Sequence, residues 1–159
     1  MRISTSRLFF LALLTLAVGL LQAQAKSDFS GTWKANIAKS DFGPAPPPDS
    51  VVMKIVHEDP SLKANVAQIG GGTGDVTYDM VYTTDGKECV NHPGGNEFKS
   101  TLKWEGDDLV IDTQGSWEGT DFTAKDRWTL SGGGKTVTIE RHASTAGGDF
   151  DMKLVFDKQ

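Results

Sequence analysis

The sequence is poor in cysteine and has no cluster of basic residues, and each lack excludes a class of protein. Cys89 is the only cysteine of the 159 residues, so no internal disulfide can stabilise the fold and packing must do so. Nucleic-acid binding needs a clustered basic surface, and no run of Lys or Arg occurs, so nucleic acid is not an expected partner. Cys89 itself has two interpretations, a reactive or dimer-forming thiol and a small buried apolar group, of which the second agrees with the usual burial of free cysteine.

A hydrophobic stretch long enough to span a membrane is also lacking. The apolar run from Leu8 to Leu21 has about 14 residues, whereas a membrane-spanning helix needs roughly 20. Arg2 and Arg7 precede this run, and the small-x-small sequence Ala23-Gln24-Ala25 follows it, as in a secretory signal peptide. We therefore expect cleavage after Ala25 and export to the periplasm or the extracellular space. No membrane span is expected after cleavage, and no lipid is expected at the new N-terminus, since no cysteine lies near the cut.

The length and charge of the remaining chain, residues 26–159, predict a single acidic domain. Two of the 16 basic residues belong to the signal peptide, which leaves 14 against 21 acidic residues and a net charge of −7. A chain of this length is enough to bury one sizeable core. We therefore expect one domain over residues 26–159, present as a monomer.

Helical periodicity is absent from residues 26–159, and an alternation of apolar and polar residues takes its place. The clearest example is the stripe Val76, Tyr78, Met80 and Tyr82. Further stripes contain Val51, Met53 and Ile55; Leu62, Ala64 and Val66; Phe98, Leu102 and Trp104; Leu109 and Ile111; Phe122, Ala124, Trp128 and Leu130; Val137 and Ile139; and Phe150, Met152, Leu154 and Phe156. Each stripe predicts a strand that buries one face.

Short turn sequences separate the stripes, among them Asp85-Gly86, Glu105-Gly106-Asp107 and Ser131-Gly132-Gly133-Gly134. Connections this short join antiparallel neighbours, because a parallel crossover needs about a dozen residues. A flat sheet of about ten short strands would expose two edges, and closure into a barrel removes them. The expected fold class is all-β, with a single antiparallel up-and-down meander barrel of about 8–10 strands.

Two stretches interrupt the alternation. Four prolines between Lys39 and Ser50 predict a stiff, extended strap, which is either a cover over one mouth of the barrel or a linker. The sequence Gly70-Gly71-Gly72-Thr73-Gly74 predicts a loop with wide conformational freedom.

The segment Asp28-Phe29-Ser30-Gly31-Thr32-Trp33-Lys34 places a Gly-x-Trp motif in the first expected strand. A Gly-x-Trp at this position, followed by a long meander, resembles the opening of the lipocalins and fatty-acid-binding proteins, the calycin-type barrels. The chain looks like a divergent, secreted bacterial member, without the paired cysteines and C-terminal helix pattern of typical lipocalins. The resemblance implies that Gly31 and Trp33 plug one end of the barrel, with Arg141 or Lys153 as the cation packed across the indole ring.

The resemblance also implies a lumen that holds a small apolar ligand, such as a fatty acid. The residues expected to line this lumen come from the inward-facing stripes: Met53, Ile55, His57, Tyr78, Met80, Tyr82, Leu102 and Trp104. The competing hypothesis is a filled barrel that acts through its outer surface as an envelope or inhibitor-like protein. An enzyme is a distant third.

No pattern in the sequence predicts a catalytic residue, a metal site or a cofactor. His57 continues the face of Met53 and Ile55, and its interpretations are a rim or core histidine, a polar anchor for a ligand head group, and a haem ligand as in nitrobindin-like barrels. The histidines show no ligand spacing to one another. Residues 132–136 lack the spacing and the helix of a phosphate-binding loop, and no Gly-x-Ser-x-Gly sequence occurs.

Overall fold

A computed structural model describes residues 26–159, and the expected signal peptide over residues 1–25 lies outside the described residues. The described chain is almost entirely β-structure, with two short 3₁₀ turns, so the all-β prediction is confirmed. The elements are β1 (Gly31–Ala35), η1 (Ile37–Lys39), β2 (Ser50–Glu58), β3 (Ser61–Ile69), β4 (Val76–Thr83), β5 (Asp85–Asn91), η2 (Pro93–Gly95), β6 (Phe98–Glu105), β7 (Asp108–Trp117), β8 (Thr120–Ser131), β9 (Thr136–Thr145) and β10 (Gly148–Lys158). No helix within residues 26–159 has the length and apolar character needed to cross a membrane.

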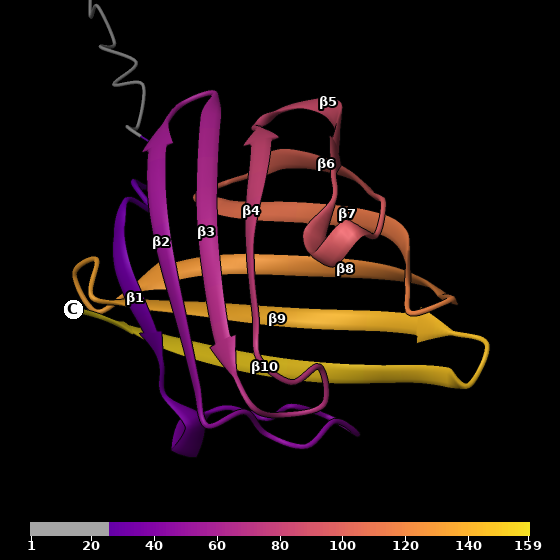
Figure 1. Ribbon diagram of the computed structural model, residues 1–159. Helices are drawn as coiled ribbons and strands as arrows, with labels where there is room; N and C mark the ends of the chain where they lie inside the picture. The colour runs from indigo at the N-terminus through magenta and orange to yellow at the C-terminus, as the bar shows by residue number, and fades with distance from the viewer. Residues whose placement is uncertain (1–25) are drawn as a thin grey trace, which may run out of the picture.

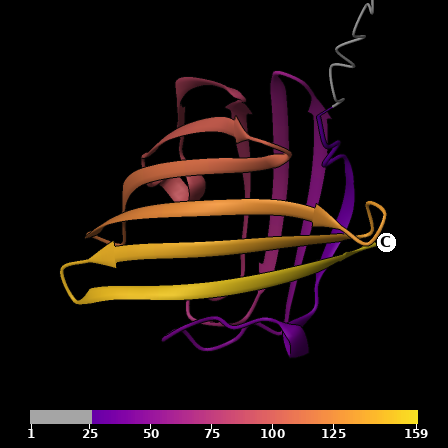
Figure 2. The same cartoon turned by 180° about the vertical axis from the view of Figure 1, so that it is seen from behind.

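The ten strands form one antiparallel meander that curls into a nearly closed barrel, as the sequence predicts (Figure 1). The sheet order is β4-β3-β2-β1-β10-β9-β8-β7-β6-β5, so the first and last strands lie side by side in its middle. The register pairs Trp33 with Lys158 and Ala35 with Phe156. Seen from the front and from behind, β1–β4 run nearly across β6–β10, and the two groups enclose the core between them (Figure 2).

Local sequence explains most of the hairpins. Glu105-Gly106-Asp107 joins β6 to β7 and Ser131–Gly134 joins β8 to β9, at the turns expected from the sequence. Gly106 has φ 65, which is a conformation that side chains disfavour and glycine adopts without strain. Because side chains alternate across a strand, every second residue of each hairpin faces the enclosed core.

The two outer strands of the meander, β4 and β5, meet at a seam that side chains help to close. Asn91 Oδ1 accepts the backbone N–H of Val81 at 2.7 Å, and Asn91 Nδ2 donates to the carbonyl of the same residue at 3.0 Å. Cys89 Sγ accepts the N–H of Thr83 at 3.2 Å. The Asn91 amide thus supplies the two hydrogen bonds that a backbone peptide group supplies in a β-ladder.

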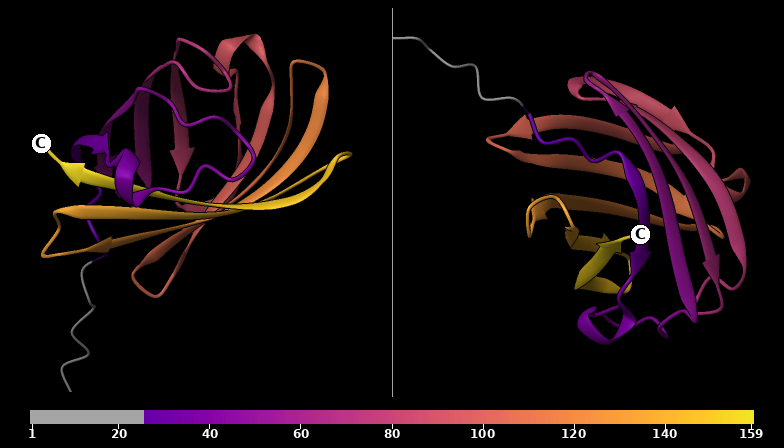
Figure 3. Two further views of the ribbon diagram at one scale, coloured as in Figure 1. Left: turned by 90° about the horizontal axis from the view of Figure 1, so that it is seen from below. Right: turned by 90° about the vertical axis from the view of Figure 1, so that its left-hand side faces the viewer.

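The proline-rich strap leaves β1 along the free edge of β10 and crosses the lower end of the barrel. The N–H of Asn36 donates to Val155 O at 2.7 Å, and Asp41 pairs with Lys153 in an isolated bridge. Further along, Pro46 and Pro48 lie against the glycine-rich β3–β4 loop at Gly71. The strap therefore links β10 to that loop below the strands (Figure 3).

Candidate functional site

Trp33 and its motif glycine fill the end of the barrel nearest the chain start. Trp33 has no exposed surface, and its Nε1 donates to Phe29 O at 2.9 Å. Gly31 has φ 139, and a Cβ at this position would lie 2.6 Å from Lys158 Cε. The glycine is therefore suited to its backbone conformation and also leaves room for the Lys158 side chain.

The cation over the Trp33 ring is Lys158, which corrects the expectation of Arg141 or Lys153. Lys158 Nζ lies 5.1 Å from the indole centroid, a separation typical of a cation–π contact. Lys158 pairs directly with Trp33 in the β1–β10 register, which brings its side chain to the ring. Arg141 is committed to Asp126 instead, and Lys153 is exposed.

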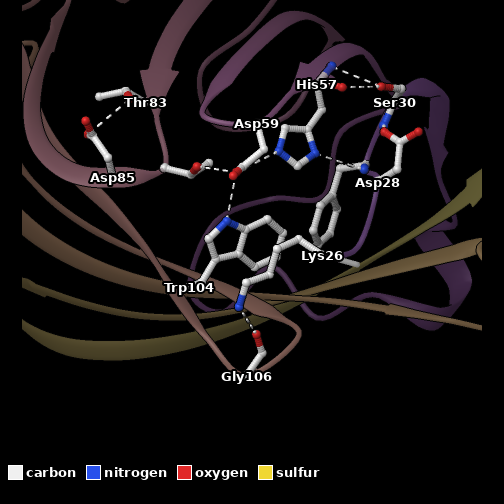
Figure 4. A network of polar contacts seen from close by, with 11 residues as sticks. Lys26, Asp28, Ser30, His57, Asp59, Thr83, Asp85, Trp104 and Gly106 are labelled. Carbon is white, nitrogen blue, oxygen red and sulfur yellow. Dashed lines mark hydrogen bonds and ion pairs between the residues drawn. The ribbon is translucent and has the colours of Figure 1, made fainter. Parts of the chain in front are cut away.

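A cluster of rings around Phe29 completes this end, and we call Phe29, Trp33, His57, Trp104 and Trp128 the proximal plug. Phe29 is fully buried, and its ring lies 6.0 Å from His57, 6.2 Å from Trp104 and 6.1 Å from Trp128. The Phe29 N–H donates to His57 Nδ1 at 3.3 Å, which assigns the ring proton of neutral His57 to Nε2. His57 thus ties the residues before β1 to the end of β2 (Figure 4).

Asp59 is the polar centre at the outer side of the plug (Figure 4). Its Oδ1 accepts the Thr84 hydroxyl and, at 2.9 Å, the indole N–H of Trp104, and it lies 3.7 Å from His57 Nε2. The hydroxyl of Thr84 and the N–H of Trp104 hold the pKa of Asp59 below its ordinary value of 3.8. Lys26 covers the other side of Trp104, with Nζ 5.2 Å from the ring centroid and 3.0 Å from Gly106 O.

The opposite half of the interior is more accessible and contains a charged pair. We call the inner face of β6–β10 at its ends farthest from β1 the distal half; its inward side chains include Phe98, Phe122, Arg141, Phe150 and Met152, all partly exposed. Arg141 binds Asp126 through two hydrogen bonds, Nε–Oδ1 at 2.7 Å and Nη2–Oδ2 at 2.6 Å. The charge of Asp126 raises the pKa of the Arg141 guanidinium, so Arg141 stays protonated.

The two tyrosines of the chain approach this pair from the facing strand β4. Burial raises the pKa of Tyr78 and of Tyr82, and the charges of Arg141 and Asp126 act on both hydroxyls. Neither hydroxyl forms a hydrogen bond with another residue of the described chain. Tyr82 is only 9% exposed, but its hydroxyl oxygen is not fully buried and stays accessible.

The residues predicted to line a lumen all face the interior but divide into two groups. Met53, Ile55, Met80, Tyr82 and Leu102 are buried in the core cluster, and Tyr78 packs against its accessible side. His57 and Trp104 belong to the proximal plug, where Phe29 and Asp59 already bind them. Leu102 has no exposed surface, whereas Tyr78 retains some. Of these predicted residues, Tyr78 and Tyr82 are the best candidates for a ligand contact, because each places a hydroxyl group on the inner wall.

Asp126, Phe29 and Asn91 are the site and seam residues that sequence reasoning missed. Asp126 interrupts the inward stripe of β8 between Ala124 and Trp128, and it pairs across the strands with Arg141, which interrupts the stripe of β9. Two opposite charges at inward positions of neighbouring strands could therefore have been used to predict an ion pair inside the barrel. Asn91 and Phe29 gave no comparable signal, because Asn91 binds the backbone of Val81 and Phe29 precedes the first strand, so neither has a complementary side chain to reveal its partner.

The remaining histidines lie away from His57. His142 Nδ1 is 2.8 Å from Asp151 Oδ1 on the outer face, and this hydrogen bond raises the pKa of His142. His92 Nε2 is 3.8 Å from Glu97 Oε2. Within residues 26–159, no three His, Cys, Asp or Glu side chains gather in a way suited to a metal ion.

Solved structures share this architecture, although no known sequence family matches the chain and no curated protein is similar to it in sequence. The zebrafish ileal bile acid-binding protein, solved with cholic acid, has a TM-score of 0.58 and 19% identity, over 84% of this chain and 100% of that chain. A secretory abundant heat soluble protein of Ramazzottius varieornatus has a TM-score of 0.56 and 13% identity, over 85% and 97%. A fatty acid binding protein of Schistosoma mansoni, solved with arachidonic acid, has a TM-score of 0.53 and 8% identity, over 82% and 96%.

These likenesses define the fold class. The protein has a nearly closed ten-strand antiparallel meander barrel, the fold that it shares with these bile acid-binding and fatty acid binding proteins. The resemblance drawn from Gly31 and Trp33 is thereby confirmed at the level of the fold.

Proposed function

We propose that the protein binds a small apolar molecule reversibly inside its barrel. The proposal rests on a difference in solvent accessibility between the two ends of the inner wall. Phe29 and Trp33 in the proximal plug have no exposed surface, whereas Phe98, Phe122 and Met152 in the distal half face inward and remain accessible. Accessible inward-facing side chains offer apolar area that a ligand can bury, at about 25 cal/mol per Å² before ordering costs.

The similar barrels support this proposal through what was found in two of them. The zebrafish protein was solved with cholic acid and the Schistosoma mansoni protein with arachidonic acid, both small molecules with large apolar parts. A non-enzymatic binding role follows as part of the proposal.

Export forms a second part of the proposal and rests on the first 25 residues of the sequence. Cleavage after Ala25 would leave Lys26 as the first residue, and Lys26 already contacts Trp104 and Gly106. Expression of the full sequence, fractionation of the cells and N-terminal sequencing test this part. The expected product begins at Lys26 and leaves the cytoplasm; an uncleaved cytoplasmic product would contradict it.

Native mass spectrometry of protein purified without detergent tests the binding proposal, followed by organic extraction of any adduct. Displacement of Nile red, a neutral dye that fluoresces in apolar sites, gives the affinity for candidate ligands. Met152→Trp fills the distal half and is expected to weaken Nile red binding about tenfold, because it removes volume from the site. Lys153→Trp adds the same ring to the outer face of the same strand and is the matched control.

The result that would refute luminal binding is a protein that carries no adduct and leaves Nile red non-fluorescent. Equal affinities of the Met152→Trp and Lys153→Trp variants would also count against a site in the lumen. The second candidate function, interaction through the outer surface, would then stand first. It is favoured by exposed Val56, Val81 and Val90 on the outside of β2, β4 and β5 and by an outer polar hollow of about 440 Å³ over β8–β10.

A further inference from the structure

The charged pair in the distal half is electrically neutral and already complete. Asp126 and Arg141 are direct cross-strand partners on the inward faces of β8 and β9. Both carboxylate oxygens of Asp126 receive an N–H of Arg141, and the Asp126 side chain is only 8% exposed. The Arg141 side chain keeps 38% of its surface accessible, so part of the guanidinium faces open space. The pair therefore presents donors to the lumen without presenting a net charge.

The tyrosine hydroxyls add neutral polar groups beside this pair. Tyr78 and Tyr82 come from β4, across the interior from β8 and β9, and their hydroxyls have no hydrogen-bond partner among the described residues. Burial keeps both phenols protonated, so each can donate one hydrogen bond and accept another. Neither hydroxyl oxygen is fully buried, so each is accessible for a hydrogen bond to a ligand.

We propose that the lumen selects an apolar ligand whose polar end is an uncharged hydrogen-bonding group, such as a hydroxyl or an amide, and discriminates against a carboxylate. This inference rests on the proposed binding function and specifies its ligand class. A carboxylate entering beside Arg141 would meet the carboxylate of Asp126, and repulsion between the two is strong where water is scarce. A neutral oxygen can accept from the remaining N–H groups of Arg141, and from Tyr78 or Tyr82, without that repulsion.

Two ligands that share one alkyl chain provide the direct test. Hexadecanol and palmitate are titrated against the Nile red complex of the wild-type protein, at a pH where palmitate is ionised. The expected result is an affinity for hexadecanol at least about tenfold above that for palmitate. An equal or higher affinity for palmitate would overturn the inference, and this comparison needs no substitution.

Asp126→Asn releases Arg141 from its counter-charge at nearly constant side-chain shape. The variant is expected to gain affinity for palmitate by about tenfold or more, because Arg141 is then free to pair with the ligand carboxylate. The matched control is Asp112→Asn, the same change on the outward face of β7, where Asp112 lies 3.2 Å from Lys125. A folded Asp126→Asn protein whose affinity for palmitate equals that of the wild type would contradict the inference.

The outcomes separate this inference from the proposal on which it rests. Nile red binding with a preference for palmitate leaves luminal binding intact and removes only the neutral-head-group inference. Failure of the wild-type protein to bind Nile red, hexadecanol and palmitate removes both.

Discussion

At the proximal plug, Phe29 and Trp33 have no exposed surface and their polar groups bind each other, whereas in the distal half Arg141 keeps 38% of its side chain accessible. Both regions combine aromatic rings with a cation, but the partners differ. Lys158 covers the face of Trp33, while Arg141 is neutralised by Asp126. The plug is closed to solvent, and within the described chain its His57 Nε2 and Trp128 Nε1 are fully buried without a hydrogen-bond partner, whereas the hydroxyls of Tyr78 and Tyr82 stay accessible. We infer that the first region serves stability and the second serves binding.

The largest effect expected from this comparison is the loss of the plug tryptophan. Trp33→Ala removes a fully buried ring and leaves Phe29 O without its donor, and we expect it to lower the free energy of unfolding by about 3 to 5 kcal/mol. Trp117→Ala removes a ring that is partly exposed and contacts Phe98 edge-on at the other end, with an expected cost of about 1 kcal/mol. Urea unfolding followed by circular dichroism measures both, and similar losses would break the comparison.

The seam between β4 and β5 is expected to respond more weakly. Asn91→Ala removes both side-chain hydrogen bonds to Val81, and we expect a loss of about 1 kcal/mol together with faster amide exchange at Val81. The control is Asn65→Ala, which removes an exposed bond to Asp79 where the backbone ladder between β3 and β4 is intact. Unchanged exchange at Val81 in the Asn91 variant would show that the side chain does not close the seam.

The smallest expected effect is a pH dependence at the plug. Because hydrogen bonds from Thr84 and Trp104 lower the pKa of folded Asp59, its contribution to stability is present above its ordinary pKa of 3.8 and is lost as the pH falls through the folded value. The urea midpoints of wild type and Asp59→Asn should therefore differ above pH 3.8 and converge in stronger acid. In a Thr84→Val background, the urea midpoints of the proteins with and without Asp59→Asn should lie closer together, since the Thr84 hydrogen bond is the larger cause of the lowered pKa of Asp59. A constant difference across this range would mean that Asp59 does not titrate as described.

Much of the barrel could be predicted from the sequence because its hairpins are local. Alternating stripes such as Val76 to Tyr82 fix which face of a strand is buried, and short turns such as Glu105-Gly106-Asp107 fix its neighbour. The residues predicted to line the lumen face inward for the same reason. Their division between plug and distal half was not predictable, because it depends on Phe29, a residue before the first strand, folding back onto His57 and Trp104.

The cation that covers Trp33 could not be predicted from the sequence either. Gly31 and Trp33 are readable as a motif, but Arg141, Lys153 and Lys158 are equally basic in the sequence. Only the register of β1 against β10 places Lys158 beside Trp33, whereas Asp126 meets Arg141 within the local β8–β9 hairpin. Register between distant strands follows from closure of the whole sheet, not from any local pattern.

The sequence by itself determined the meander, the inward faces of its strands and the single core, since alternation and turn chemistry act over a few residues. The tertiary structure decided which inward residues meet: Lys158 with Trp33 at the plug, Asp126 with Arg141 in the distal half, and Asn91 with Val81 at the seam. Lys158 and Trp33 come from opposite ends of the described chain and meet because the sheet brings β1 beside β10, whereas the other two pairs lie 15 and 10 residues apart on consecutive strands. The neutral charge state of the lumen, and with it the proposed ligand class, belongs to this second group.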